Sequence, residues 1–105
     1  MTATLMVRAE VGAEDRDAFE RWYQEEHLPD AAKAFDALSA WRGWSDVDPS
    51  LHYAFYQFDS LERLQRIMGS EAIADLIAEF DRVWEGRVVR TREIIDCLHR
   101  IEGGG

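Results

Sequence analysis

The order in which strand-like and helix-like patterns follow one another limits the fold of this chain more than any other feature. Over residues 4–11 apolar and polar side chains alternate with a period of two, which predicts a strand that Gly12 ends. Residues 13–27 begin with acidic side chains and then carry apolar residues at helical spacing, which predicts a helix. Because Pro29 disfavours helical geometry at the preceding residue, we expect this helix to bend there and to continue as a short turn through Phe35.

The second half of the chain repeats the pattern. Segments 38–47 and 51–59 are rich in aromatic and β-favouring residues, and Asp48–Ser50 between them is typical of a turn, so the two predict a hairpin. A cap at Asp59 or Ser60, a second cap at Ser70 and apolar stripes over 60–84 predict helix, and 88–98 returns to the composition of a strand. The order is therefore β-α-β-β-α-β, the ferredoxin-like α+β arrangement of a four-stranded antiparallel sheet with both helices on one face.

The length of the chain fits one domain. A chain of 105 residues buries roughly 65% of the surface that its unfolded form exposes, which is enough for a single core. We expect residues 1–102 to form that domain and Gly103–Gly105 to be a flexible tail. Apolar runs no longer than about five residues predict neither a transmembrane helix nor a signal peptide, so we expect a cytoplasmic protein.

The charge of the chain argues against two classes of partner. The formal net charge is -9, and the acidic excess lies in the two predicted helical regions, 12–38 and 59–85. Nucleic acids and anionic membranes are bound first through basic surfaces that neutralise phosphate. We therefore expect neither a nucleic acid nor a membrane as partner.

Aromatic residues gather in the predicted hairpin. Six of them lie within 18 residues: Trp41, Trp44, Tyr53, Phe55, Tyr56 and Phe58. Since side chains alternate along a strand, Tyr53 and Phe55 point to one face and Tyr56 and Phe58 to the other. The face without helices would then expose a large apolar patch, which predicts a homodimer that packs sheet against sheet. A monomer with an aromatic platform for a ligand, or rings displaced to the periphery by irregular strand ends, are the alternatives.

A motif at the predicted bend resembles a known family. Trp22-Tyr23-Gln24-Glu25-Glu26-His27-Leu28-Pro29 resembles the W-Y-x-x-E-H-x-P signature of EthD-like members of the dimeric α/β-barrel superfamily. The resemblance continues through Leu38–Ala40 and His52–Ser60 and includes a basic fourth strand. It implies a ferredoxin-like subunit that dimerises into a barrel and encloses a pocket. Related pockets serve cofactor-free oxygenases, isomerases, polyketide cyclases and haem enzymes, so the resemblance constrains function weakly.

His27 is the candidate catalytic residue. It follows Tyr23 by four positions and so continues the apolar stripe of its helix. Its position at a helix C-terminus among acidic neighbours favours the protonated imidazole, which suits a general acid or an anion anchor. The alternative is that His27 caps the last helical turn. Trp22 and Tyr23 are interpreted as pocket walls or as core.

Arginines and two further polar residues are candidates for substrate binding. The arginines lie in the predicted strands: Arg8, Arg42, Arg90 and Arg92. Facing a pocket, they would bind a carboxylate or enolate oxygen; facing outward, they would protect a strand edge from pairing with other chains. Tyr56 and His52 share one face of their strand and would add a hydroxyl and an imidazole to the same pocket.

The sequence predicts no metal site and no cofactor. The three histidines lack ligand spacing, and Cys97 is the single cysteine. Haem is the alternative, since some members of the superfamily hold it through one histidine.

Three functions remain open. The first is a cofactor-independent enzyme of the oxygenase, isomerase or cyclase type, in which His27 moves a proton on an apolar or aromatic carbonyl or enol compound. The second is a non-catalytic ligand-binding or accessory dimer of a catabolic or stress pathway. The third is a structural interaction module without a pocket. A cavity of several hundred Å³ around His27 would distinguish the first from the third.

Overall fold

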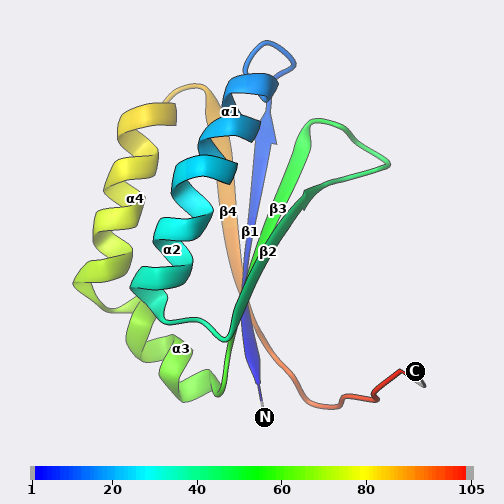
Figure 1. Ribbon diagram of the computed structural model, residues 1–105, viewed down its shortest axis with the longest axis vertical. Coiled ribbons are helices and arrows are strands. Elements are labelled where there is room, and N and C mark those ends of the chain that lie inside the picture. The colour runs from blue at the N-terminus through cyan, green and yellow to red at the C-terminus, as the bar shows by residue number, and fades with distance from the viewer. Residues whose placement is uncertain (1, 104–105) are drawn as a thin grey trace.

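The elements follow the predicted order in the computed structural model, which describes residues 2–103 (Figure 1). They are β1 (Ala3–Val11), α1 (Arg16–Trp22), the π-helical turn η1 (Tyr23–His27), α2 (Leu28–Phe35), β2 (Ser39–Trp44), β3 (Leu51–Phe58), α3 (Leu61–Met68), α4 (Glu71–Trp84) and β4 (Val88–Asp96). The first helix begins at Arg16 rather than at residue 13, because Gly12 and Asp15 form a turn closed by a 3.0 Å backbone hydrogen bond. The last strand ends at Asp96, two residues before the predicted end.

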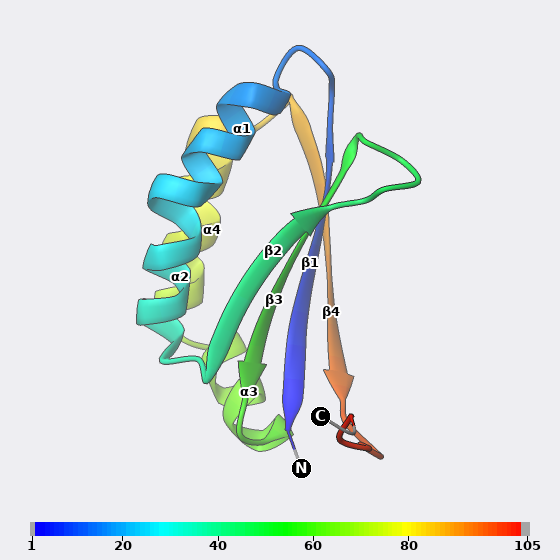
Figure 2. The ribbon, with the colours of Figure 1, turned by 45° about the vertical axis from the view of Figure 1, so that its right-hand side comes forward.

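The four strands form one antiparallel sheet in the order β2-β3-β1-β4. Figure 2 shows the helices together on one face of this sheet, with the other face bare. Leu5 in the central strand β1 lies opposite Tyr56 of β3 and Ile94 of β4, which fixes the register across the sheet. The α+β ferredoxin-like fold predicted from the sequence is therefore confirmed.

Alternation along β3 divides its side chains between the two faces. Those that face the helices are buried, with exposed fractions of 1% or less: His52, Ala54, Tyr56 and Phe58. Tyr53 and Phe55 lie on the bare face; the sequence predicted that they share a face but not which one. The ring of Trp41 from β2 stacks on Phe55 with centroids 4.2 Å apart. Trp41 itself is 58% exposed, so the bare face carries an accessible aromatic patch.

Two chain reversals use left-handed backbone. Asp36 ends α2 with φ 51°, and Gly86 turns the chain from α4 into β4 with φ 81°. Gly86 has no Cβ to strain this conformation, which explains a glycine there. The predicted tail extends to Gly104 and Gly105, which lie outside the described residues. Among residues 2–103, every helix is too short or too polar to cross a lipid bilayer.

Candidate functional site

The bend predicted at Pro29 is a π-helical turn within one continuous helix. Pro29 has no amide hydrogen for the carbonyl of Glu25, and its ring crowds that carbonyl. The helix accommodates it by widening, so that the amide of Leu28 donates to the carbonyl of Tyr23, five residues earlier. The chain then passes directly into α2.

This turn keeps His27 on the buried face. Five side chains spaced by four residues are buried along the bent helix: Phe19, Tyr23, His27, Ala31 and Phe35. In an unbroken α-helix this spacing would rotate the stripe by about 160° over sixteen residues. The extra residue of the π turn rotates the following part back by about 100°, so all five side chains stay within one face.

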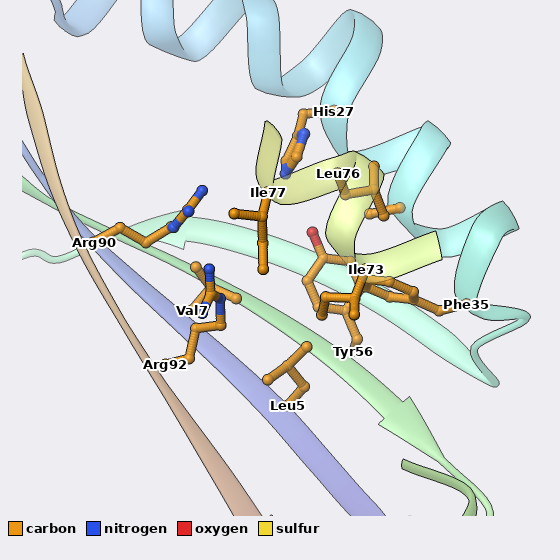
Figure 3. A pocket seen from close by; sticks show the side chains of 11 residues that line it. Leu5, Val7, His27, Phe35, Tyr56, Ile73, Leu76, Ile77, Arg90 and Arg92 are labelled. Carbon is orange, nitrogen blue, oxygen red and sulfur yellow. The ribbon is translucent and has the colours of Figure 1, made fainter. Parts of the chain in front are cut away.

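A cavity of about 30 Å³ lies between the bent helix, α4 and the sheet (Figure 3). Its wall is mostly apolar, and its polar lining residues are His27, Tyr56, Arg90 and Arg92. A cavity of this size holds about one water molecule, whereas small-molecule sites usually measure roughly 300–1,000 Å³. The cavity therefore has the predicted location but not the predicted volume, and a ligand enters it only if side chains at its mouth move.

Aromatic rings enclose the imidazole of His27. The ring of Trp22 stacks on it with centroids 4.6 Å apart, and Tyr23 meets it edge-on at 4.9 Å. His27 is 9% exposed. Burial, with a smaller contribution from the positive charge of Arg90, lowers the pKa of His27 to about 4.

The expectation that His27 is protonated is therefore wrong. It rested on a helix C-terminus at His27 and on Glu25, Glu26 and Asp30. The helix instead continues into α2, so His27 caps no helix end, and the three carboxylates are exposed to solvent and do not offset the burial of the ring. At neutral pH the imidazole is neutral. It can accept a proton or a hydrogen bond from a ligand in the cavity.

Tyr56 and Tyr23 join the cavity to the core. Their hydroxyl oxygens lie 3.3 Å apart in a buried hydrogen bond. Burial raises the pKa of Tyr23 to about 12 and that of Tyr56 well above its usual value, so both phenols stay protonated. Tyr56 lines the cavity, whereas Tyr23 belongs to the core and Trp22 supports the far side of the His27 ring.

Arg42 and His52 belong to a polar cluster away from the cavity lining. Arg42 binds both carboxylate oxygens of Glu20, one of them at 2.9 Å, and donates to Gln24 Oε1 at 2.8 Å. Trp44 Nε1 donates to Glu20 at 2.8 Å, and Arg42 Nη1 lies 3.3 Å from His52 Nε2. Hydrogen bonds from Arg42 and Trp44 lower the pKa of Glu20 to about 2, so the two charges neutralise each other.

The same cluster determines the protonation state of His52. Burial, followed by the charge of Arg42, lowers the pKa of His52 to about 4. Because a guanidinium can only donate, Nε2 of His52 accepts and the ring is neutral. Both residues therefore link α1 to the hairpin, and the structure does not bring them to the cavity.

The remaining three arginines lie on different faces of the sheet. Arg8 lies on the bare face, where its guanidinium is 3.5 Å from Glu10, and it does not reach the cavity. Arg90 and Arg92 pair with Ala9 and Val7 of β1, which places them on the helix face and in the cavity wall. The pattern predicted that these two share a face but not which face.

The described residues offer no metal centre. Within residues 2–103 there is no group of three histidine, cysteine or acidic side chains that could hold an ion. The cavity, at about 30 Å³, has no room for haem, and aromatic rings pack against His27. The residues present therefore do not fit the haem alternative.

Comparison with known proteins identifies the fold. No protein-family model and no curated protein sequence matches the chain. An ethyl tert-butyl ether D (EthD) family protein from Bacillus halodurans is similar in structure, with a TM-score of 0.69 and 17% identity over 89% of this chain and 97% of that one. A proposed antibiotic biosynthesis monooxygenase from Deinococcus radiodurans has a TM-score of 0.72 and 10% identity over 100% of both chains.

A third similar structure has a described activity. It is a single-residue mutant of SnoaB from Streptomyces nogalater, a cofactor-independent oxygenase, with a TM-score of 0.65 and 10% identity over 97% of this chain and 98% of that one. At these identities the likeness concerns the fold. The chain thus has the ferredoxin-like fold that EthD-like and antibiotic biosynthesis monooxygenase-like proteins share, in agreement with the resemblance carried by its Trp22–Pro29 motif.

Proposed function

We propose that this protein binds a small apolar or aromatic molecule bearing a carbonyl or enol oxygen, and that His27 moves a proton on it without a cofactor. The observation that carries the proposal is the imidazole of His27, neutral and nearly buried, at the wall of a cavity between helices and sheet. The fold shared with a cofactor-independent oxygenase supports the same class of activity.

The chemistry divides between His27 and the cavity wall. A neutral imidazole removes a proton from the carbon beside a carbonyl, and the resulting enolate oxygen needs donors. Tyr56 is a protonated phenol in the same wall, and Arg90 is a cation there. The imidazolium that forms next to Arg90 is unfavourable, so it readily returns the proton, and the site suits isomerisation or enolisation.

We also propose that two copies pack through their bare sheet faces. Trp41 and Phe55 form an exposed aromatic stack there, and Val89 and Ile95 of β4 are 62% and 50% exposed. The SnoaB-like and EthD-like fold supports this arrangement. Dimerisation leaves the cavity, which opens on the other side of the sheet, free for a ligand.

Non-catalytic binding is the second candidate. The low basicity of His27 favours it, because general bases work best with a pKa near the working pH. Both candidates require a ligand at the same wall, so they differ only in whether a proton moves.

Deuterium exchange distinguishes the two. The probe is 2-tetralone, an aromatic ketone with enolisable hydrogens, incubated with the protein in heavy water and followed by NMR. We expect exchange faster than in buffer, and a loss of at least about 100-fold in the excess rate for His27→Gln. His99→Gln, which removes an exposed histidine of the C-terminal segment, is the matched control and should keep the full rate.

Two results would contradict proton transfer by His27. Equal exchange by wild type and His27→Gln would remove His27 from the reaction. Binding of the ketone at the cavity without exchange in either protein would leave the protein a binder.

A further inference from the structure

The cavity wall differs in charge from the rest of the chain. The protein carries a net charge of -9, yet the charged side chains that line the cavity are Arg90 and Arg92. Of the described residues, no aspartate or glutamate contributes to this wall. Figure 3 shows both arginines reaching from β4 toward the space bounded by His27 and Tyr56. A positive, mostly apolar wall in an acidic protein suits an apolar anion.

Arg90 is held in place with much of its binding capacity unused. Its side chain is 13% exposed, and its guanidinium carbon lies 3.9 Å from the centre of the Phe80 ring. A single ion pair, 3.3 Å from Nη2 to Asp81 Oδ1, engages it. Since a guanidinium has five N–H donors in a planar fork, most of them remain for a ligand.

Arg92 adds a second guanidinium on the same face of β4. Within residues 2–103, no carboxylate lies within 4.0 Å of it. Burial, followed by the charge of Arg92, lowers the pKa of Arg90, so the two guanidinium groups repel each other. A ligand carboxylate would relieve this repulsion and occupy the free donors.

We infer that the ligand of this cavity is an apolar carboxylate, held by Arg90 and Arg92 through its carboxylate group and by the leucine and isoleucine side chains of α4 through its body. This inference rests on the proposed function and specifies the substrate class of the same site. Ile73, Leu76 and Ile77 form the α4 side of the wall. An arginine side chain is long and flexible, so Arg92, which is exposed, can move outward to admit the ligand.

Binding of the anion would also change His27. Burial lowers the pKa of this imidazole most, the charge of Arg90 lowers it further, and the charge of Glu79 on α4 raises it. A carboxylate paired with Arg90 cancels the contribution of this arginine, so the pKa of His27 should rise when the ligand binds. The rise would bring the imidazole closer to the basicity that proton transfer needs.

A paired set of probes tests the inference. The carboxylates phenylacetate and 4-phenylbutyrate are compared with their neutral amides, by NMR titration of wild-type protein with backbone and His27 ring signals observed. We expect the carboxylates to bind about tenfold more tightly than the amides, with shifts at the cavity residues and a raised His27 midpoint. Arg92→Gln should reduce this preference several-fold, because it removes one of the two guanidinium groups that hold the carboxylate. Arg66→Gln, an exposed arginine of α3 paired with Glu62, is the matched control and should keep it.

The other outcomes would refute either the carboxylate ligand alone or the small-molecule site as a whole. Amides that bind at the cavity as tightly as the carboxylates, or a preference that is undiminished in Arg92→Gln, would refute the carboxylate and leave the proposed small-molecule site standing. If none of the four probes shifts the cavity signals, both the carboxylate and the proposed site are refuted.

Discussion

The buried imidazole of His27 should make the stability of this protein fall as the pH decreases from about 7.5 to about 5. Burial and Arg90 lower the pKa of His27 to about 4 in the folded protein, against 6.5 for an ordinary histidine. Between these two values the unfolded chain binds more protons than the folded one. The free energy of unfolding therefore rises with pH in this window. The part of it that His27 contributes is lost on acidification toward pH 4.

The size of this effect follows from the two pKa values. Proton linkage through His27 removes about 2 kcal/mol of stability between about pH 7.5 and 5, with a slope of about 1.2 kcal/mol per pH unit near pH 5. Small domains are stable by roughly 5–15 kcal/mol, so the loss is large enough to measure. His52, whose pKa is also lowered to about 4, adds a loss of the same sign.

Urea unfolding followed by tryptophan fluorescence checks this prediction. The measurements span about pH 5 to 7.5 at one protein concentration, because association would shift apparent stability. His27→Gln should lower the slope by about 1.2 kcal/mol per pH unit near pH 5, while the exposed His99→Gln should leave it unchanged. An NMR titration of the His27 ring should give a midpoint near 4. A midpoint near 6.5, or equal slopes for His27→Gln and wild type, would refute the burial argument.

Further substitutions test the polar pairs and the bare face. Tyr56→Phe leaves the Tyr23 hydroxyl buried without its partner and should lower the free energy of unfolding by about 1–3 kcal/mol, part of which the double variant with Tyr23→Phe recovers. Glu20→Gln removes the countercharge of Arg42, whose side chain is 10% exposed; since Glu20 itself is 44% exposed, we expect a loss of about 1–2 kcal/mol in denaturant titrations. Phe55→Asp places a charge on the bare face and should convert a dimer to monomer in sedimentation, with unchanged circular dichroism; a dimer that persists would place the interface elsewhere.

The fold could be predicted from the sequence because alternation is a local signal. The period of two in β1 and β3 assigns each side chain to a face of the sheet. As that period requires, Tyr53 and Phe55 lie on one face of β3, and Tyr56 and Phe58 lie on the other. Turn residues and helix caps then fix where the direction of the chain changes. The Ser60 side chain, for example, accepts a hydrogen bond from the amide of Arg63 at the start of α3.

The site could be predicted only in part, because its charge state depends on contacts distant in the sequence. The neighbours of His27 in the sequence are acidic but exposed, whereas Arg90, sixty-three positions later, lies close enough to lower its pKa. The register that pairs Arg92 with Val7 places this residue beside the cavity, and a one-residue slip would turn it away. Glu20, the partner of Arg42, carried no sequence signal beyond its place in an acidic helix.

Because side chains alternate along β3, substitutions in this strand affect either the cavity and core or the bare face. Even-numbered positions such as Tyr56 border the cavity and core, and odd-numbered positions such as Tyr53 and Phe55 belong to the bare face. If two copies pack through their bare faces as proposed, a combinatorial library restricted to the odd positions would vary this contact without changing the lining of the cavity. Of the even positions, Tyr56 alone lines the cavity, so a library at this position would vary ligand preference while the other even positions keep the core intact. Selection could therefore tune the two properties in separate experiments on a single strand.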